Sequence, residues 1–129
     1  MNESEPQATH SVPAPKKGVA RLISATVYSV NGLKAAFKYE EAFRLEIIVF
    51  CVLAPIAFWL GDSNVDKVLL LGSLVLVILA ELINSAIEAV VDRTGEEFNE
   101  LSGRAKDLGS AAVFVSMLLV VFVWAMLLL

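Results

Sequence analysis

Hydrophobic positions along the chain form one segment with helical spacing, followed by three longer apolar runs. In residues 18–39 apolar residues recur every three or four positions and most charged residues fall elsewhere, which is typical of an amphipathic helix on a membrane surface. The apolar runs predict membrane-spanning helices at about 42–60, 65–92 and 108–129. We therefore expect an all-α membrane protein with three transmembrane helices and an amino-terminal surface helix.

Polar stretches separate these segments. Residues 1–17 are polar and contain prolines, so they are predicted to be a disordered tail ahead of a membrane domain at 18–129. The Gly-Asp-Ser-Asn sequence at 61–64 predicts a turn between the first and second spans. A longer polar segment at 93–107 is expected to form a loop before the third span.

Composition supports a membrane protein and argues against a soluble domain, an internal disulfide and a nucleic-acid-binding protein. Apolar residues make up 57% of the 129 residues, against about 45–50% in an ordinary soluble domain, and the mean hydropathy is +0.72. The single cysteine, Cys51, excludes an internal disulfide. No basic stripe interleaved with aromatic residues is present, so nucleic acid is not an expected partner.

Basic residues predict the orientation in the membrane. Six lysines and arginines between residues 16 and 44 precede or begin the first span, and three lie between the second and third spans. The remaining loop contains only Lys67. The positive-inside rule therefore places the amino terminus and the 93–107 loop in the cytoplasm, and the carboxyl terminus outside.

A polar stripe interrupts the second apolar run. Glu81, Asn84, Ser85, Glu88 and Asp92 fall within an arc of roughly 100° on a helix. A charge in the middle of a bilayer costs about 2.5–3.5 kcal/mol on insertion scales, so two glutamates on one stripe require pairing or a function. One interpretation makes the deeper carboxylate a base toward a lipid hydroxyl, while the shallower one meets a divalent cation such as Mg²⁺. Alternatively, the stripe joins helices in an oligomer or relays ions in a small transporter.

Phosphoryl transfer would also require basic side chains, and Arg104 and Lys106 lie near the end of the polar segment 93–107. The phosphate-binding and catalytic motifs of soluble kinases are absent from the sequence. A nucleotide site in this protein would therefore differ from the sites of soluble kinases.

The segment 81–92, followed by 100–107, resembles the signature of the prokaryotic integral-membrane diacylglycerol kinases. The resemblance extends from about Arg21 through the third span. It implies a homotrimeric helical bundle in the bacterial inner membrane, with a periplasmic carboxyl terminus. It also implies transfer of the γ-phosphate of ATP, with Mg²⁺, to diacylglycerol at the cytoplasmic face.

The resemblance further implies roles for individual residues. Glu81 matches the catalytic base and Asn84 its polar neighbour, Glu40 and Glu88 match the metal-binding carboxylates, and Lys106 matches a phosphate contact. Further substrate-site or nucleotide-site positions correspond to Arg21, Tyr28, Ser29, Glu46 and Asp107.

One position departs from the family pattern. Ser24 stands where the best-known members have a lysine that helps to hold phosphates, so Arg21, Lys106 or another basic residue must serve here. The acceptor also stays open, because undecaprenol shares a primary alcohol with diacylglycerol. An ion-coupled transporter and a purely oligomeric scaffold are the alternatives from other classes.

Overall fold

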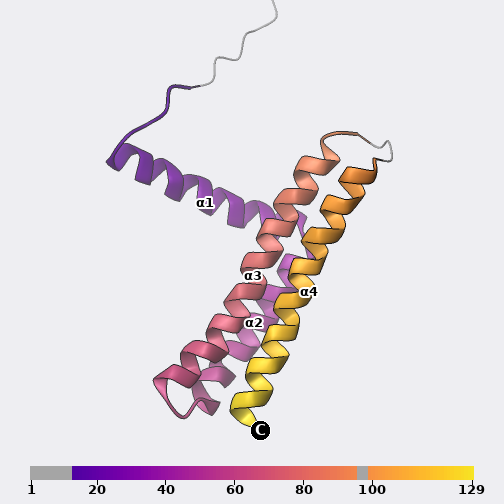
Figure 1. The fold of residues 1–129 in the computed structure, drawn as a ribbon. Coiled ribbons are helices and arrows are strands. Elements are labelled where there is room, and N and C mark those ends of the chain that lie inside the picture. The colour runs from indigo at the N-terminus through magenta and orange to yellow at the C-terminus, as the bar shows by residue number, and fades with distance from the viewer. Residues whose placement is uncertain (1–12, 96–98) are drawn as a thin grey trace, which may run out of the picture. The chain divides into compact units, whose positions relative to one another are not determined.

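The computed structural model describes residues 13–95 and 99–129, so residues 1–12 of the predicted tail and residues 96–98 of the predicted loop lie outside it. Within these ranges the chain is helical and contains no strand (Figure 1). The predicted all-α fold is confirmed for this part of the chain. The helices are α1 Val19–Tyr39, α2 Glu41–Leu60, α3 Asn64–Asp92 and α4 Glu100–Leu128.

The chain divides into two compact units, Met1–Gly32 and Leu33–Leu129, and the boundary falls within α1. In the first unit, Gly18 adopts a positive φ of 63°, which glycine tolerates without strain, immediately before α1 begins. Its carbonyl accepts hydrogen bonds from the backbone N–H groups of Arg21 and Leu22. Large apolar side chains such as Leu22 and Ile23 are exposed on this helix, as expected for a segment that lies on a membrane surface.

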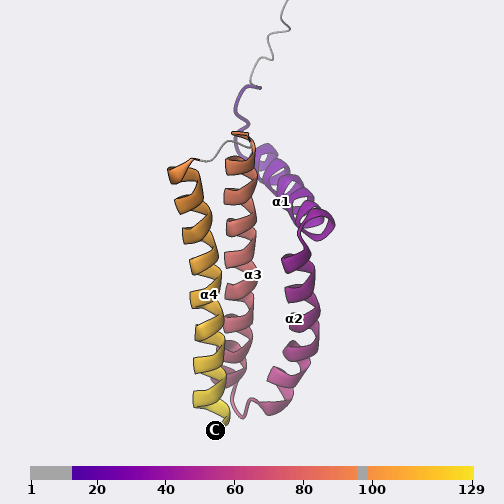
Figure 2. The same cartoon turned by 90° about the vertical axis from the view of Figure 1, so that its right-hand side faces the viewer.

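The second unit contains a bundle in which α2, α3 and α4 run side by side (Figures 1 and 2). Helix α3 packs against both α4 and α2. Each of the three helices is long and apolar enough to cross a membrane. With 29 residues, α3 is about 43 Å long, which exceeds a hydrocarbon layer of about 30 Å. Its ends therefore have the length to reach beyond the hydrocarbon.

Polar side chains form hydrogen bonds at the helix ends beside the two short loops, between α1 and α2 and between α2 and α3. Ser63 caps α3 by accepting a hydrogen bond from the backbone of Asp66, whose carboxylate accepts one from the backbone of Ser63. This reciprocal capping box fixes the start of α3 directly after the predicted turn. Between α1 and α2, the Arg44 guanidinium donates to the carbonyls of Phe37 and Lys38 at 2.9 and 3.0 Å. These bonds satisfy carbonyls at the carboxyl end of α1.

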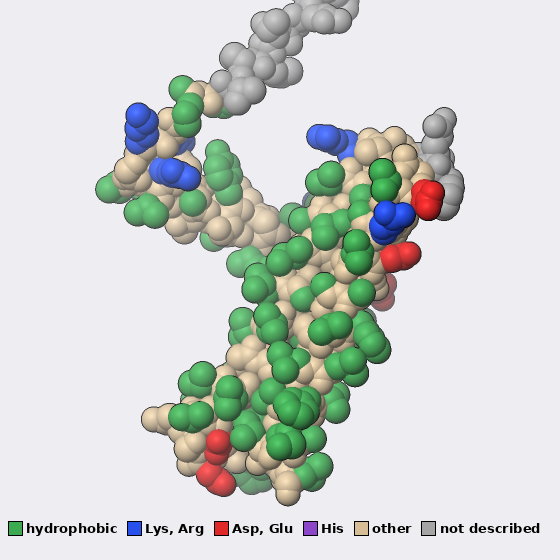
Figure 3. Space-filling view, viewed as in Figure 1, with side chains coloured by type: hydrophobic (Ala, Val, Ile, Leu, Met, Phe, Trp, Pro, Cys, Tyr) green, Lys and Arg blue, Asp and Glu red, His purple; other side chains and the backbone are tan. Residues whose placement is uncertain are grey.

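Apolar side chains dominate both the interior and the surface of the bundle. Figure 3 shows hydrophobic side chains along the length of the bundle, while its charged side chains gather toward the two ends. Lipid, rather than water, is the expected surrounding of such a surface. The buried apolar side chains of the bundle include Ala57 of α2, Leu70, Leu74 and Val77 of α3, and Val113 of α4.

Three polar side chains away from the polar stripe donate to backbone carbonyls. Ser73 donates to the Leu70 carbonyl at 2.8 Å, and Ser116 donates to the Val113 carbonyl at 2.6 Å. The Trp124 indole donates across from α4 to the Leu70 carbonyl at 3.3 Å. In an apolar medium each such bond avoids the cost of an unpaired polar group.

Helix bounds agree with the expected ranges to within one residue for α1, α2 and α3. The third span is different, because α4 begins at Glu100, eight residues before the predicted start at Leu108. Asn99 caps α4 by accepting hydrogen bonds from the backbone of Leu101 and Ser102 at 2.9 and 3.2 Å. Hydropathy predicts where a helix becomes apolar, whereas the cap determines where it begins.

Candidate active site

Two buried polar side chains of the bundle lie on one face of α3. Glu81 is 6% exposed and Asn84 is 7% exposed, in a helix that is otherwise mainly apolar. Glu81 and the Glu46 carboxyl of α2 lie close enough to interact. Glu88 and Glu40 also act on Glu81 electrostatically. A buried carboxyl group on a spanning helix is a candidate for the residue that accepts a proton in catalysis.

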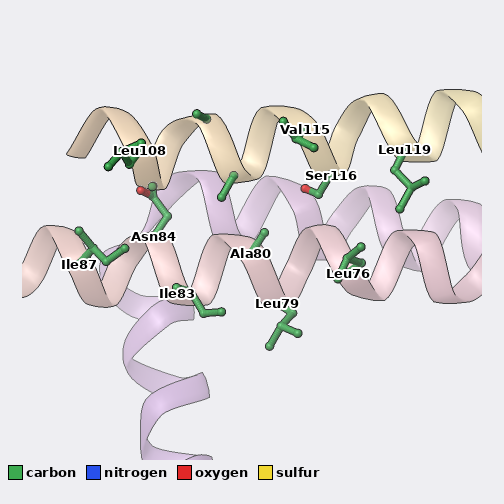
Figure 4. A pocket seen from close by; sticks show the side chains of 13 residues that line it. Leu76, Leu79, Ala80, Ile83, Asn84, Ile87, Leu108, Val115, Ser116 and Leu119 are labelled. Atoms are coloured by element: carbon green, nitrogen blue, oxygen red, sulfur yellow. The ribbon is translucent and has the colours of Figure 1, made fainter. Parts of the chain in front are cut away.

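Asn84 connects this centre to α4. Its Nδ2 donates to Glu88 Oε1 at 3.3 Å, while its Oδ1 is shielded from solvent and has no partner in the described part of the chain. The side chain points toward α4 (Figure 4). Gly109 makes this approach possible, because a Cβ atom at that position would overlap Asn84 Oδ1. The glycine therefore holds open the space that the Asn84 amide occupies.

Two apolar hollows adjoin the buried polar groups. The first has a volume of about 690 Å³ between α3 and α4, and Asn84 and Ser116 are its polar side chains (Figure 4). The second, of about 410 Å³, is lined by α2, α3 and α4, and Glu46 is its polar side chain. The Oε2 atom of Glu46 is shielded from solvent and has no partner among the described residues. Each hollow thus combines an apolar lining with a buried oxygen that can meet a hydrogen-bond donor.

An ion pair joins the ends of α3 and α4 beyond the buried groups. Lys106 Nζ lies 2.6 Å from Asp92 Oδ1, and both side chains are partly exposed. A lysine ammonium has three donors, so this pair leaves capacity for an incoming anion. Arg104 pairs with Glu100 at 3.6 Å within α4, and Asp107 is exposed.

The remaining candidate residues belong to the first unit. Arg21 and Tyr28 line one hollow of about 520 Å³ together with Lys16 and Ser24. Ser29 lies one position beyond Tyr28, and its hydroxyl donates to the Ala25 carbonyl at 2.8 Å. The structure therefore groups Arg21 with Tyr28, while the Ser29 hydroxyl is used by its own helix.

Comparison with known proteins gives consistent matches along most of the chain. Residues 27–128 match the sequence family described as prokaryotic diacylglycerol kinase. The chain belongs to this family. The diacylglycerol kinase of Haemophilus influenzae is 51% identical over 107 residues, which cover 83% of this chain and 91% of the relative. That of Escherichia coli strain K12 is 50% identical over 111 residues, covering 86% of this chain and 91% of the relative. That of Pseudomonas aeruginosa is 44% identical over 120 residues, covering 91% and 98%.

Family membership confirms the resemblance seen in the sequence, and with it the prediction of an enzyme of the lipid-kinase type. The roles of individual residues stay predictions, but the structure shows how they group. Glu46 adjoins Glu81, Asn84 bonds to Glu88, and the charges of Glu40 and Glu88 act on Glu81. We call these five residues the carboxylate centre.

Two contacts were not anticipated from the sequence. Gly109 of α4 accommodates the Asn84 amide. Lys16 lies in the segment predicted to be a disordered tail, yet its ammonium contacts Ser24 Oγ at 2.9 Å. Neither contact has a sequence signal, since no periodicity links position 84 with 109 or position 16 with 24.

The donor set suits Mg²⁺ that arrives with a nucleotide. No group of three or more His, Cys, Asp or Glu side chains that could hold a metal ion is found among residues 13–95 and 99–129. Mg²⁺ commonly takes one or two protein carboxylates and completes its coordination with phosphates and water. Two carboxylates from the carboxylate centre, Glu40 and Glu88, match that requirement in chemistry and number.

Proposed function

We propose that this protein transfers the γ-phosphate of MgATP to the hydroxyl of diacylglycerol, forming phosphatidic acid. The observation that carries the proposal is the buried Glu81 carboxyl on α3, beside Glu46 and next to the Asn84–Glu88 hydrogen bond. A carboxyl group in a spanning helix carries a large desolvation cost, which favours a functional reason for its presence. The names of the relatives supply the acceptor and the type of reaction.

Glu81 is the proposed general base. It accepts the proton of the lipid hydroxyl as that oxygen attacks the γ-phosphorus, and the bond from phosphorus to the bridging oxygen of ADP breaks. Burial supports this role, because excluding water keeps the base from being solvated and limits transfer of the phosphoryl group to water. Glu46 adjoins Glu81 and is placed to position it or to accept the proton in turn.

Asn84 and Glu88 are the proposed residues that lie between the base and the bound MgATP. Glu88 and Glu40 would hold Mg²⁺, which supplies charge neutralisation to the phosphates when it is bound with ATP. The Asn84 Nδ2 hydrogen bond at 3.3 Å orients the Glu88 carboxylate. A carboxylate with a fixed orientation binds a hard cation with less loss of side-chain freedom.

Lys106 is the proposed phosphate contact of the second unit. Asp92 holds its ammonium at 2.6 Å, which positions the charge without using all its donors. Asp107 follows it in the exposed first part of α4. Lys106 would supply positive charge that phosphoryl transfer needs. Arg21 and Tyr28 of the first unit are proposed nucleotide contacts in their own right.

The lipid substrate fits the apolar hollows that contain Asn84 and Glu46. A diacylglycerol presents one hydroxyl above long hydrocarbon chains, and each hollow presents one unpartnered buried oxygen within an apolar lining. Self-association into a homotrimer would close these hollows to bulk lipid and is part of the proposal. The basic residues before the first span and between residues 93 and 107 support a cytoplasmic amino terminus and a periplasmic carboxyl terminus. The family supports a location in the bacterial inner membrane.

The decisive experiment measures transfer of labelled phosphate from MgATP into lipid, using the purified full chain in mixed micelles. Diacylglycerol and undecaprenol are supplied in separate assays, with sizing of the oligomer as a check on folding. We expect label in phosphatidic acid and little label with undecaprenol. Absence of transfer to either alcohol by folded protein would overturn the proposal, and preferential labelling of undecaprenol would replace the acceptor.

A transporter predicts a different result. Ion-coupled transport would depend on an imposed gradient and would need neither ATP nor a lipid alcohol. The same preparation, placed in vesicles with a proton or sodium gradient and no ATP, should therefore show no gradient-dependent flux above empty vesicles.

A further inference from the structure

The hollow of the first unit is unusual in its chemistry. Its polar lining consists of two basic side chains, Lys16 and Arg21, and two hydroxyls, those of Ser24 and Tyr28, with no carboxylate among its lining residues. Arg21, Ser24 and Tyr28 follow one another at spacings of three and four, so they share one face of α1. Lys16 reaches this face from the stretch that precedes the helix.

The hydroxyl of Ser24 differs from its neighbours on α1. Thr26 donates to the Leu22 carbonyl at 2.9 Å and Ser29 donates to the Ala25 carbonyl at 2.8 Å, so the helix backbone uses both hydroxyl protons. Ser24 Oγ instead accepts from Lys16 Nζ at 2.9 Å. A hydroxyl that accepts one bond keeps its own O–H for another acceptor, and the ammonium keeps two further donors.

We propose that Lys16, held at Ser24, completes a phosphate-binding cradle with Arg21 and Tyr28. The inference rests on the proposed function, since it assigns the cradle to the phosphates of the nucleotide. Its basis is the ligand chemistry: two cations and two hydroxyls can all donate to one anion with several oxygens, and no lining carboxylate competes with it. A volume of about 520 Å³ leaves room for more than a single oxyanion contact.

Lys16 thereby supplies the positive charge that the Ser24 position lacks. A serine cannot neutralise a phosphate, but it can fix an ammonium that comes from another part of the chain. The lysine and the serine together then do what a lysine on the helix would do alone. The segment that precedes α1 becomes part of the binding site in this protein.

The test compares Lys16→Ala with Lys17→Ala in the full-length protein. Both variants remove one lysine from neighbouring positions, so their long-range electrostatic effects match, but only Lys16 lines the cradle. The KM for MgATP is measured with saturating diacylglycerol, and the dissociation constant of MgAMPPNP is measured by calorimetry. We expect Lys16→Ala to raise both by roughly fivefold to tenfold, with kcat nearly unchanged and Lys17→Ala close to wild type.

A second variant tests the part played by position 24. Ser24→Lys is combined with Lys16→Ala, which moves the ammonium onto the face that carries Arg21 and Tyr28. We expect the KM for MgATP to return to within about twofold of wild type. A general loss of folding or of surface charge at residue 16 would not be reversed by a new lysine at residue 24.

A phospholipid headgroup also carries a phosphate. A second assay therefore distinguishes binding of a phospholipid from binding of the nucleotide. At saturating MgATP, activity is followed as the fraction of phosphatidylglycerol in the micelles rises, and we expect no difference between Lys16→Ala and Lys17→Ala. A difference confined to this assay would overturn the assignment to nucleotide. Equal KM and dissociation constants for the two variants would overturn the cradle itself. If wild-type protein transfers no phosphate, the proposed function fails instead, and MgAMPPNP binding still tests Lys16.

Discussion

The phosphate-binding cradle of the first unit and the carboxylate centre of the second differ in almost every physical respect. The cradle is made of exposed cations and hydroxyls on one helix and the stretch before it. The carboxylate centre lies on α3, α2 and the α1–α2 junction, and its two deepest side chains, Glu81 and Asn84, are buried. Solvent screens charges at the cradle, whereas a low dielectric strengthens interactions at the carboxylate centre.

This difference predicts how substitutions in each region should affect nucleotide affinity and catalytic rate. An exposed ionic contact typically contributes up to about 1 kcal/mol, so the cradle should tune affinity by modest factors. A buried carboxyl cannot exchange its partners for water, so a change at the carboxylate centre should affect the chemistry and cannot be compensated by solvent. Measuring kcat and nucleotide affinity separately in substituted proteins therefore tests whether the cradle and the carboxylate centre have different roles.

The largest effect is expected for Glu81→Gln. The amide has nearly the same shape but cannot accept a proton as a carboxylate does, so kcat should fall by a factor on the order of 10²–10⁴. MgAMPPNP binding should stay within about twofold of wild type, because the base is not the nucleotide ligand. The measurements are labelled phosphate transfer and calorimetry on the same preparation. A parallel loss of nucleotide binding would contradict the separation of roles within the carboxylate centre.

Glu88→Gln should produce the next largest effect, on the Mg²⁺ requirement. Removing one of two proposed carboxylate ligands should raise the Mg²⁺ concentration for half-maximal activity by roughly 10-fold to 100-fold. Glu100→Gln is the matched control, since it removes an exposed carboxylate paired with Arg104. An unchanged Mg²⁺ titration in Glu88→Gln would remove this residue from the metal site.

Much of the fold and part of the carboxylate centre follow from the sequence. Apolar runs determine the spanning helices, and the spacing of Glu81, Asn84 and Glu88 places them on one face of α3, because both signals are local. Helix α4 begins at Glu100, eight residues before the predicted third span, because its first turns are polar and give no hydropathy signal. The contacts of Gly109 with Asn84 and of Lys16 with Ser24 depend on packing and loop conformation, which no local pattern records.

Gly109→Ala tests whether close packing positions the carboxylate centre, with an expected fall in kcat of roughly fivefold to tenfold. The added Cβ would overlap Asn84 Oδ1, so the amide must turn and its bond to Glu88 should be lost. Gly103→Ala is the control, because a Cβ at that position of α4 meets no atom within 4 Å.

A double-mutant cycle separates this positioning role from a general packing defect. In an Asn84→Ala background the overlap with Asn84 Oδ1 is absent, so Gly109→Ala should cost little further activity. Fully additive losses in kcat would mean that Gly109 acts on the enzyme by a route other than Asn84.

The smallest effect is expected outside both regions, at the turn between α2 and α3. Ser63→Ala removes the side-chain acceptor of the capping box, and loss of such a cap costs about 1 kcal/mol. Thermal unfolding in detergent should therefore shift to a lower temperature, while the KM for MgATP and kcat below the transition stay at wild-type values. Ser63→Asp should restore stability, since aspartate is an equally good helix cap. A change in KM with stability unaltered would mean that this turn communicates with the cradle or the carboxylate centre, and the functional contrast between those two regions would no longer be local.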